Sequence, residues 1–479
     1  MTHNKHTGVV GHRPAVGRGY IVVSVVVFGT VFLTILAGLV GFVFLQTKAQ
    51  VKKETREKAL QIAEAGLDYY KWRLSHFPND LTNGTGQSGP YTVPYSDPES
   101  GTIGSFQLSL AAEQYCGQVN TVTITSTGWT VQDPTIRRTV SARYARPSVA
   151  SYAYIINNSV WAGSDRQISG RYHSNGGIRM DGTNDSLVTS GVSTWSCTSS
   201  FGCSPASTTP GVWGAGTGSN LWQYPQPQVD FAGITTDLAQ IRTIAQSQGR
   251  YINETSNSDQ RGILLRFNGN GTFTYWRVTG TSAVDAQHVD TGSDWHDDYH
   301  TITSTSTPTT LTIPETCPVI FVEAKTWIEG VVDQKVLLGV DEITSASARA
   351  DVILNGNITY ADYTGLDGLT VIADRSILIP FESPDVMSIS GIFTAQNGYF
   401  GRNYYPSSDG PEYMRSSLTV NGTIVSNARE GTKWTSGSTV VSGYQNRVNI
   451  YDEDLVVSPP PFTPKTSTTP TFLEWEEVE

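Results

Sequence analysis

The side chains most able to do chemistry are concentrated in one short segment, HVDTGSDWHDDYH, at residues 288–300. Imidazole nitrogens and carboxylate oxygens are common ligands of divalent cations. If this segment formed a helix, His296 and His300 would lie one turn apart and could bind a cation together. In a loop the same residues are a solvated acidic stretch, and that interpretation is favoured here. We therefore predict no metal at His288, Asp290, Asp294, His296, Asp297, Asp298 and His300.

Catalytic motifs are absent from the sequence, which contains no H-E-x-x-H, G-x-S-x-G or phosphate-loop pattern. The segment DGTNDS at Asp181 offers three oxygen ligands but lacks the remaining spacing of a calcium loop. Enzymes that cleave polysaccharides on a parallel β-helix need clustered acidic and basic residues, whereas Asp351, Asp362, Asp367 and Asp374 are scattered at turns. We predict no enzyme and no cofactor; a tethered polysaccharide-active enzyme is the lesser alternative.

The cysteines and the aromatic residues give weaker signals. Cys197 and Cys203 bracket a five-residue loop that one disulfide could close, with reduced thiols as the alternative, while Cys116 and Cys317 are far apart in sequence. The chain has 11 Trp and 22 Tyr. Aromatic rings in an irregular stretch could stack on a sugar or on a partner, or could fill a small local core. These rings belong to Trp195, Trp213, Trp222 and Tyr224.

The element that must position everything else is the N-terminal apolar segment. From Tyr20 to Leu45 the chain contains no Asp, Glu, Lys, Arg or Pro. As a helix, these residues are long enough to cross a hydrocarbon core of about 30 Å. A cleavable signal sequence is shorter, at about 7–15 apolar residues, and ends in a small-residue cleavage site that is not present here. The segment is therefore predicted to be a retained membrane helix.

The helix is predicted to continue beyond the membrane. In VKKETREKALQIAEAGLDYYKWRLSHFP, from Val51, apolar residues recur in steps of three and four with charges on the opposite side. Pro78 and a Gly- and Asn-rich stretch end the pattern. One helix is thus expected over 20–77, its second half lying against a globular body. The stripe consists of Leu60, Ala63, Leu67, Tyr70, Leu74 and Phe77.

The composition of the remaining chain indicates on which side of the membrane it lies. It is rich in Gly, Ser, Thr and Asn, and the protein is 16% charged with a net charge of −11. An acidic chain is unsuited to nucleic-acid binding, which requires a basic surface. More lysines and arginines follow the apolar segment closely than precede it, so a bare positive-inside count would not place the N-terminus inside. Composition favours a cytoplasmic N-terminus and an extracytoplasmic bulk.

Two β-rich regions follow the helix. SFQLSLAA, NTVTITSTGW and RRTVSARYA alternate apolar and polar residues, as antiparallel strands with one buried face do. With the helix they predict a small α+β domain, whose strands lie in 78–148. Residues 149–458 carry the related segments ISGRYHSNGG (168), ISGIFTAQNG (389) and VNGTIVSNAR (420), which favour an irregular parallel β-helix over a β-sandwich.

Residues 187–312 are predicted to be an insertion in that second region. One helix is expected in DFAGITTDLAQIRTIAQSQG, capped by Asp230, followed by a hairpin that turns at 268–271. The Pro-rich and acidic tail, 459–479, is interpreted either as a strap or as a frayed end.

A basic leader that ends in Gly19 is followed by an uncharged span and then by the segment ALQIAEAGLDYY. This N-terminal arrangement resembles the type IV pilin-like proteins, and among them the PilX-type minor pilins. The resemblance covers about the first 145 residues. The segment matches an A-x-x-x-A-E-A-G-Φ stretch of the family at Ala59, Ala63, Glu64, Ala65, Gly66 and Leu67.

The resemblance implies that a prepilin peptidase cuts between Gly19 and Tyr20, removing the leader 1–19. The helix would be stored in the inner membrane and later pack among other pilin-like subunits. Ser24 stands where major pilins carry a glutamate, and PilX-type proteins share that absence, which implies a tip or initiation role. The head would be displayed for adhesion, to a surface glycan or a partner cell, or for assembly. A permanently anchored β-helix adhesin is the alternative.

Overall fold

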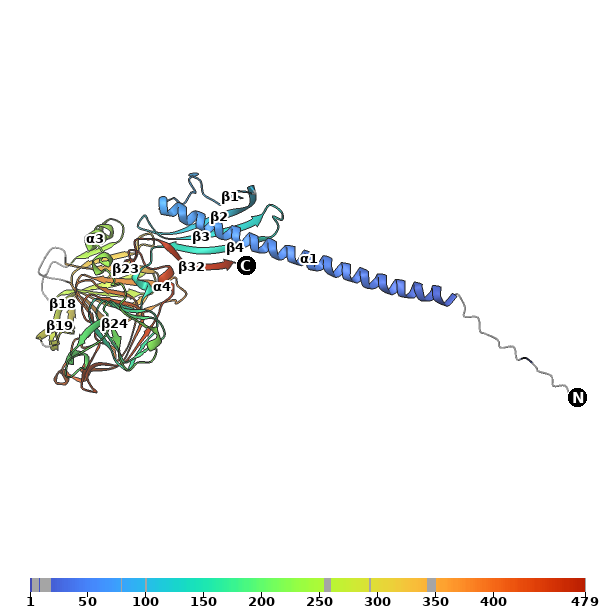
Figure 1. Ribbon diagram of the computed structural model, residues 1–479. Coiled ribbons are helices and arrows are strands. Elements are labelled where there is room, and N and C mark those ends of the chain that lie inside the picture. The colour runs from blue at the N-terminus through green and yellow to red at the C-terminus, as the bar shows by residue number, and fades with distance from the viewer. Residues whose placement is uncertain are drawn as a thin grey trace.

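A computed structural model describes residues 1, 8, 19–78, 80–99, 101–253, 260–292, 294–342 and 350–478. A long helix, α1, projects from a small antiparallel sheet, and a larger β-rich domain lies at the end of that sheet remote from the N-terminus (Figure 1). We call the sheet with the packed part of α1 the proximal domain. The larger body, between residues 149 and 458, is the distal domain.

Helix α1 spans Gly19–His76, which confirms the single long helix expected from the sequence. Its second half packs on the sheet through an apolar stripe, as periodicity predicted. The pattern was wrong at its end, because Phe77 lies after the helix and is 53% exposed, with the guanidinium of Arg73 over its ring. Ile62, which the predicted stripe omitted, is buried.

The proximal sheet has five antiparallel strands in the order β1-β2-β3-β4-β32. The three segments predicted as strands form its centre, and the Gly- and Asn-rich stretch after α1 leads into an additional edge strand, β1. The alternating burial along β3 reflects one face against α1 and one face toward solvent. The bounds are β1 Tyr91–Asp97, β2 Gly101–Tyr115, β3 Gln118–Thr130 and β4 Arg137–Ala145.

The C-terminal segment is a strand of the proximal sheet rather than a frayed end. Strand β32, Thr471–Val478, pairs antiparallel with β4, so the chain returns after completing the distal domain (Figure 1). Glu474 lies 3.2 Å from Arg143, and Glu477 pairs with Arg138. The acidic residues of the tail, which was interpreted as a strap or a frayed end, thus complement basic residues of β4.

The distal domain contains a long parallel ladder. Each strand pairs in parallel with the next, and side chains such as Leu338, Val371 and Phe393 are fully buried in one core. In spatial order the strands are β16 Arg250–Asn253, β21 Val319–Glu323, β23 Lys335–Val340, β25 Gly368–Ala373, β27 Val386–Ala395, β29 Met414–Ser426, β5 Tyr154–Ile156, β8 Tyr172–Ser174, β11 Val188–Ser190 and β15 Trp222–Gln223.

A second parallel ladder runs beside the first and contains the related segments. Ile389 pairs with Val420 and Gly391 with Gly422, so two of the predicted copies lie in register on neighbouring strands. Both glycines have a positive φ, which a side chain would disfavour at this bend. The strands are β17 Gly262–Asn268, β22 Thr326–Val332, β24 Val352–Tyr360, β27, β29, β31 Thr439–Ile450, β7 Arg166–Ile168 and β10 Thr183–Asn184.

The spatial order differs from the order along the chain. The chain enters at β5, beside the late strand β29, runs outward to β15, and restarts at the far end with β16. Residues 187–312 are therefore not a separate insertion, because β11, β15, β16 and β17 all belong to the ladders. Those strands are only two to seven residues long, and periodicity over so few residues is weak.

The expected helix in this stretch is two helices. α2, Phe231–Ile234, and α3, Leu238–Ser247, are separated because Asp237 accepts a hydrogen bond from the backbone N–H of Gln240 and caps α3. Asp230 caps α2, as predicted. The expected hairpin is present between β17 and β18, Thr272–Gln287, with its turn at 269–271.

Candidate assembly surface

The N-terminal half of α1 is an apolar cylinder against which none of the described residues packs. From Tyr20 to Leu45 its large hydrophobic side chains are 45–81% exposed. The hydroxyls of Thr30 and Thr34 donate to backbone carbonyls one turn earlier, at 2.9 and 2.8 Å, so these polar atoms are satisfied inside the helix. Such a surface is stable in hydrocarbon or among other apolar helices, but not in water.

Helix α1 is also the only helix of the described residues that is long and apolar enough to cross a membrane, judged by length and composition. Its apolar half points away from both domains (Figure 1). This geometry is consistent with a single-pass anchor. The distal domain would then lie at the far side of the proximal sheet from the membrane.

The second half of α1 approaches the proximal sheet closely. Small residues allow this approach, because a Cβ on Gly128 of β3 would collide with the backbone of Ala59 and Ala63. A Cβ on Gly66 would meet the ring of Phe106 at 2.9 Å. The small residues of the family-like segment are thus used within the chain, where they let helix and sheet come into contact.

The residues predicted to act in assembly therefore divide into two groups. Ala63, Gly66 and Leu67 are buried against the chain's own sheet, whereas Glu64 is exposed and Ala65 is partly exposed. Only the outward-facing members are free to contact another molecule. Ser24 lies on the apolar half and is also partly exposed.

The predicted processing site lies at the start of the helix. Gly19 is the first residue of α1, and Tyr20, 81% exposed, follows it. Residues 2–7 and 9–18 of the predicted leader lie outside the described residues. Cleavage between Gly19 and Tyr20 stays a prediction.

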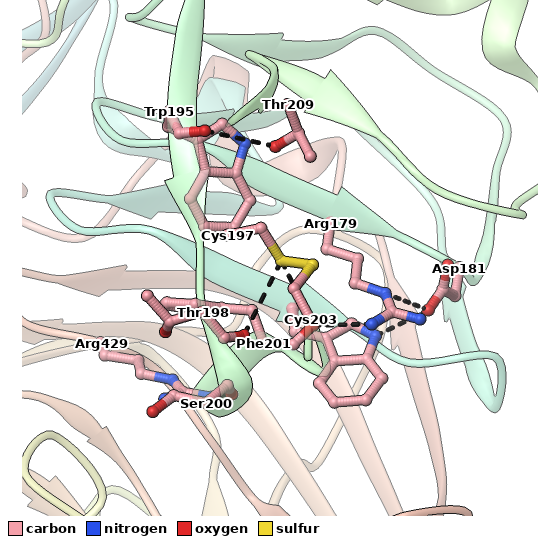
Figure 2. The surroundings of a disulfide bond; sticks show 11 residues. Arg179, Asp181, Trp195, Cys197, Thr198, Ser200, Phe201, Cys203, Thr209 and Arg429 are labelled. Atoms are coloured by element: carbon pink, nitrogen blue, oxygen red, sulfur yellow. Dashed lines mark hydrogen bonds and ion pairs between the residues drawn. A yellow bond between two sulfur atoms is a disulfide. The ribbon is translucent and has the colours of Figure 1, made fainter. Parts of the chain in front are cut away.

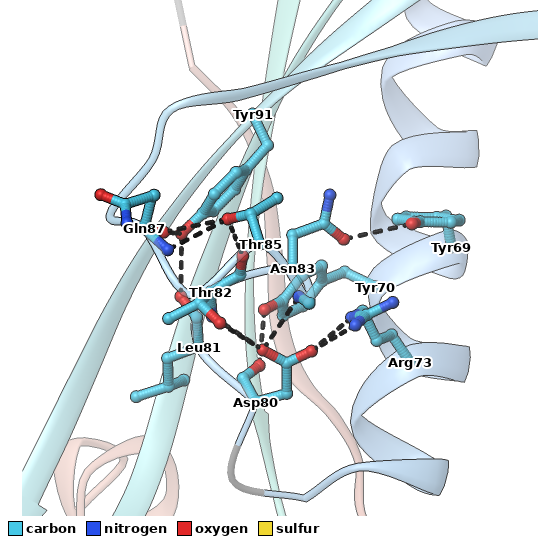
Figure 3. Close-up of polar contacts among 11 residues, drawn as sticks. Tyr69, Tyr70, Arg73, Asp80, Leu81, Thr82, Asn83, Thr85, Gln87 and Tyr91 are labelled. Carbon is cyan, nitrogen blue, oxygen red and sulfur yellow. Dashed lines mark hydrogen bonds and ion pairs between the residues drawn. The ribbon is translucent and has the colours of Figure 1, made fainter.

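The distal end of α1 is fixed by a polar cluster (Figure 3). Asp80 lies 2.5 Å from the guanidinium of Arg73 and accepts hydrogen bonds from the backbone N–H groups of Thr82 and Gly84. Burial alone opposes the ionisation of Asp80. The backbone N–H groups and Arg73 outweigh burial and lower its pKa to about 2. The loop after α1 is therefore tied to the last turn of the helix.

We predict that Asp80→Asn lowers the free energy of unfolding by about 1–2 kcal/mol at pH 7, the usual cost of losing hydrogen bonds to a charged group. Because the folded pKa lies below the unfolded value of about 3.9, this stabilisation is present above that value and is lost as the pH falls toward 2. Thermal unfolding of both proteins should therefore differ at pH 7 and converge near pH 2. Asp68→Asn, at an exposed position of the same helix, is the control and should change little at either pH.

Two disulfides are present in the described residues. Cys197 is bonded to Cys203, beside Arg179, whose side chain lies between Asp181 and the carbonyl of Phe201 (Figure 2). The second disulfide joins Cys116 to Cys317, 201 residues away, a pairing that sequence spacing did not suggest.

The Cys116–Cys317 bond links the two domains. Cys116 is in the turn between β2 and β3, and Cys317 lies two residues before the start of β21. The backbone N–H of Cys116 donates to the carbonyl of Thr316 at 2.8 Å. Leu238 and Phe321 pack in the same cluster. The distal domain is thus held to the proximal sheet by a covalent and apolar contact as well as by the chain crossings.

The His- and Asp-rich segment is a turn followed by a strand, not a helix: residues 289–291 form the turn and Trp295 begins β19. In β19, Trp295–Thr305, alternation places His296, Asp298 and His300 on the inner face. The ring of His296 stacks on that of His288 at 3.7 Å, and Asp298 accepts a hydrogen bond from Tyr405 at 2.6 Å and pairs with His300. These contacts hold β19, which pairs with β18, against the ladders. His296 and His300 do not lie one helical turn apart, because both are in β19.

The other candidates for chemistry are occupied by internal contacts. Asp181 lies 2.8 Å from both Arg179 and the indole N–H of Trp161, and Asp351 pairs with Arg375. Asn397 donates to Asp374 at 2.9 Å, and Asp362 accepts from the backbone of Thr364. The predicted aromatic group is dispersed: Trp195 packs on Phe201, Trp213 lies under Arg179, Trp222 donates to Asn184, and Tyr224 is 40% exposed.

Comparison with known proteins found a solved structure of low similarity. No protein-family description matches the chain, and no curated protein matches it. Among solved structures it is similar to the competence-associated pilin ComZ from Thermus thermophilus. The two share 13% identity over 88% of this chain and 97% of that one, with a TM-score of 0.31. We base no inference on a similarity of this size.

Proposed function

We propose that this protein is a pilin-like subunit of a type IV pilus or a related filament, with a structural rather than a catalytic role. The observation that carries the proposal is the division of α1. One half is exposed and apolar, and the other is fixed on an antiparallel sheet by Ala59, Ala63 and Gly66. A helix apolar on all sides can exchange lipid for neighbouring helices at small net cost, because van der Waals contacts replace lipid contacts.

We further infer a minor, tip-type subunit of the PilX kind, with its N-terminus cytoplasmic before assembly. Ser24 supplies no carboxylate to offset the charged amine of a neighbouring helix, so repeated stacking of this chain would lack that attraction. The large distal domain extends beyond the far end of α1 (Figure 1). At a filament tip no further subunit would collide with it.

We also propose that the distal domain is an irregular parallel β-helix displayed at the surface for adhesion or assembly. The parallel ladders and their common core support this classification. Glycans or partner cells are the ligands we would test first for adhesion.

The test is the N-terminus of the native protein in cells that carry a prepilin peptidase. Intact-mass measurement should find a chain that begins at Tyr20, and gold labelling of sheared filaments should mark their ends. Gly19→Leu should block the cleavage, whereas Gly17→Leu, two residues earlier, should not.

A permanently anchored surface protein is the second candidate, and Ser24 favours it equally, since an anchor needs no glutamate. An uncleaved Gly19–Tyr20 junction in a protein confined to the membrane fraction would reject the filament role and leave this alternative.

A further inference from the structure

A groove of about 900 Å³ lies between α1 and the turn that joins β3 to β4. Three basic residues of α1, Lys52, Lys53 and Arg56, line its helical wall, and Leu60 adds apolar surface. Part of the turn, 131–136, forms the opposite wall. The groove therefore opens on the charged side of α1, which neither the packing on the proximal sheet nor the apolar half of the helix uses.

The groove lies directly beyond the apolar span of α1. That span ends at Leu45, and at about 1.5 Å per residue Lys52 and Lys53 follow it by about 10–12 Å along the helix axis. The headgroup layer adds about 5–8 Å to each side of a hydrocarbon core. Side chains of a helix lean toward its N-terminus, which is here the membrane side. The long lysine side chains thus extend back toward the lipid phosphates.

The basic wall is not neutralised by the chain itself. Lys52, Lys53 and Arg56 are exposed, and none of them forms an ion pair within the part of the chain that the structure describes. Lys58, which does not line the groove, instead pairs with Glu54 at 2.8 Å. Three positive charges on one wall are therefore available to a ligand.

The acidic residues that line the groove are mostly engaged in other contacts. Glu477 pairs with Arg138, and Asp133 accepts hydrogen bonds from the backbone N–H and the hydroxyl of Thr135 at 3.1 and 2.5 Å. Glu57 is the remaining acidic residue of the lining. An excess of positive charge is left on the helical wall.

The turn beside the groove exposes apolar side chains at the same level. Val131 is 61% exposed, and its backbone N–H donates to the carbonyl of Ile103 at 3.0 Å. Ile103 is itself 38% exposed. Cations beside exposed apolar residues are typical of surfaces that lie among lipid headgroups. Acidic residues near this end of the sheet that do not line the groove are Asp97, Glu99 and Glu476.

We propose that this groove binds the headgroup of an anionic phospholipid, on the face of the membrane from which α1 emerges. The phosphate would accept charge-assisted hydrogen bonds from Lys52, Lys53 and Arg56. Val131 and Ile103 would enter the interfacial layer beside it. Lipid binding would then fix the proximal domain on the membrane surface. This inference rests on the proposed anchoring of α1 in a membrane, but not on the filament role.

Other occupants fit less well. Anchoring of α1 keeps the groove beside lipid at a high effective concentration, whereas a soluble anion would have to bind from dilute solution. An acidic segment of another protein could pair with the lysines, but it would leave Val131 and Ile103 exposed to water. A nucleic acid would meet a chain with a net charge of −11.

The experiment is native mass spectrometry of the full chain in detergent, titrated with phosphatidylglycerol and with phosphatidylcholine of the same acyl chains. We expect the anionic lipid to bind about tenfold more tightly. Lys53→Gln combined with Arg56→Gln should reduce that preference to about twofold, because two of the three cations are lost. Lys52 is kept, since its charge also acts on Asp133.

A matched control tests the position of the charges. Lys58→Gln combined with Arg261→Gln removes the same charge at exposed residues that do not line the groove, and it should keep the preference. Three results would overturn the proposal: equal binding of both lipids by the folded protein, a preference that the groove variant keeps, or one that the control loses to the same extent. Circular dichroism shows whether each variant is folded.

Two competition arms identify the source of the anion. Displacement of the lipid by an equal concentration of glycerol phosphate would assign the groove to a soluble anion, and displacement by hexaglutamate to a protein partner; either result rejects the lipid. None of these measurements depends on cleavage at Gly19. A failure of the lipid preference and a failure of the proposed filament role can therefore be told apart.

Discussion

Replacing Cys116 and Cys317 together with alanine is expected to lower the free energy of unfolding by about 5 kcal/mol. The bond closes a loop of 201 residues, so its loss restores a large amount of chain entropy to the unfolded state. It also joins the β2–β3 turn to the start of β21, which fixes the distal domain on the proximal sheet. Guanidinium unfolding of the full chain in detergent, followed by tryptophan fluorescence, measures the change.

The other disulfide provides a matched control. Cys197 and Cys203 are only six residues apart, and the same relation gives about 2 kcal/mol for their loss. The informative quantity is therefore the ratio of the losses in unfolding free energy that the two double cysteine-to-alanine variants show. Equal effects would contradict a role for the long loop and would mean that local strain or residual structure dominates.

The elements with strong local patterns could be predicted from the sequence. Helix α1, Gly19–His76, was predictable because a stretch of 26 residues without charge or proline is followed by apolar residues in steps of three and four, and both patterns are helical. The central proximal strands were predictable because their residues alternate. The pairing of segments such as those at Ile389 and Val420 followed from their similarity.

What could not be predicted depends on contacts between distant residues. Strand β32 completes the sheet through pairing with β4, which no local pattern in an acidic tail indicates. The Cys116–Cys317 bond depends on how the two domains meet. The spatial order of the ladders, in which the early strands from β5 onward follow the late strand β29, was equally inaccessible, because strands as short as two or three residues carry no usable period.

The joint between the early and late strands of the distal domain depends on a buried ion pair. Arg166 of β7 lies 2.5 Å from Glu430, which follows β29, and their side chains are 3% and 1% exposed. Arg166 also donates to the hydroxyl of Tyr154 at 2.7 Å. These contacts connect the first strands of the distal domain, β5 and β7, to the segment that follows β29, one of its last strands.

Arg166→Met is expected to destabilise the protein by about 3–5 kcal/mol, because it leaves the Glu430 carboxylate buried without a partner. The double variant Arg166→Met, Glu430→Leu should recover most of that loss, since it buries two apolar side chains of similar size instead. Both are measured by guanidinium unfolding as above.

Arg266→Met is the control, because Arg266 pairs with Glu329 but is 53% exposed. Its effect should be several-fold smaller than that of Arg166→Met. The comparison tests whether the entry of the chain beside β29 needs a charged contact at all. If the double variant stays as unstable as Arg166→Met, the ion pair contributes more stability than is needed to offset the cost of burying its two charges. The specific geometry of Arg166, with Tyr154 beside it, would then be what holds the first strands against the last.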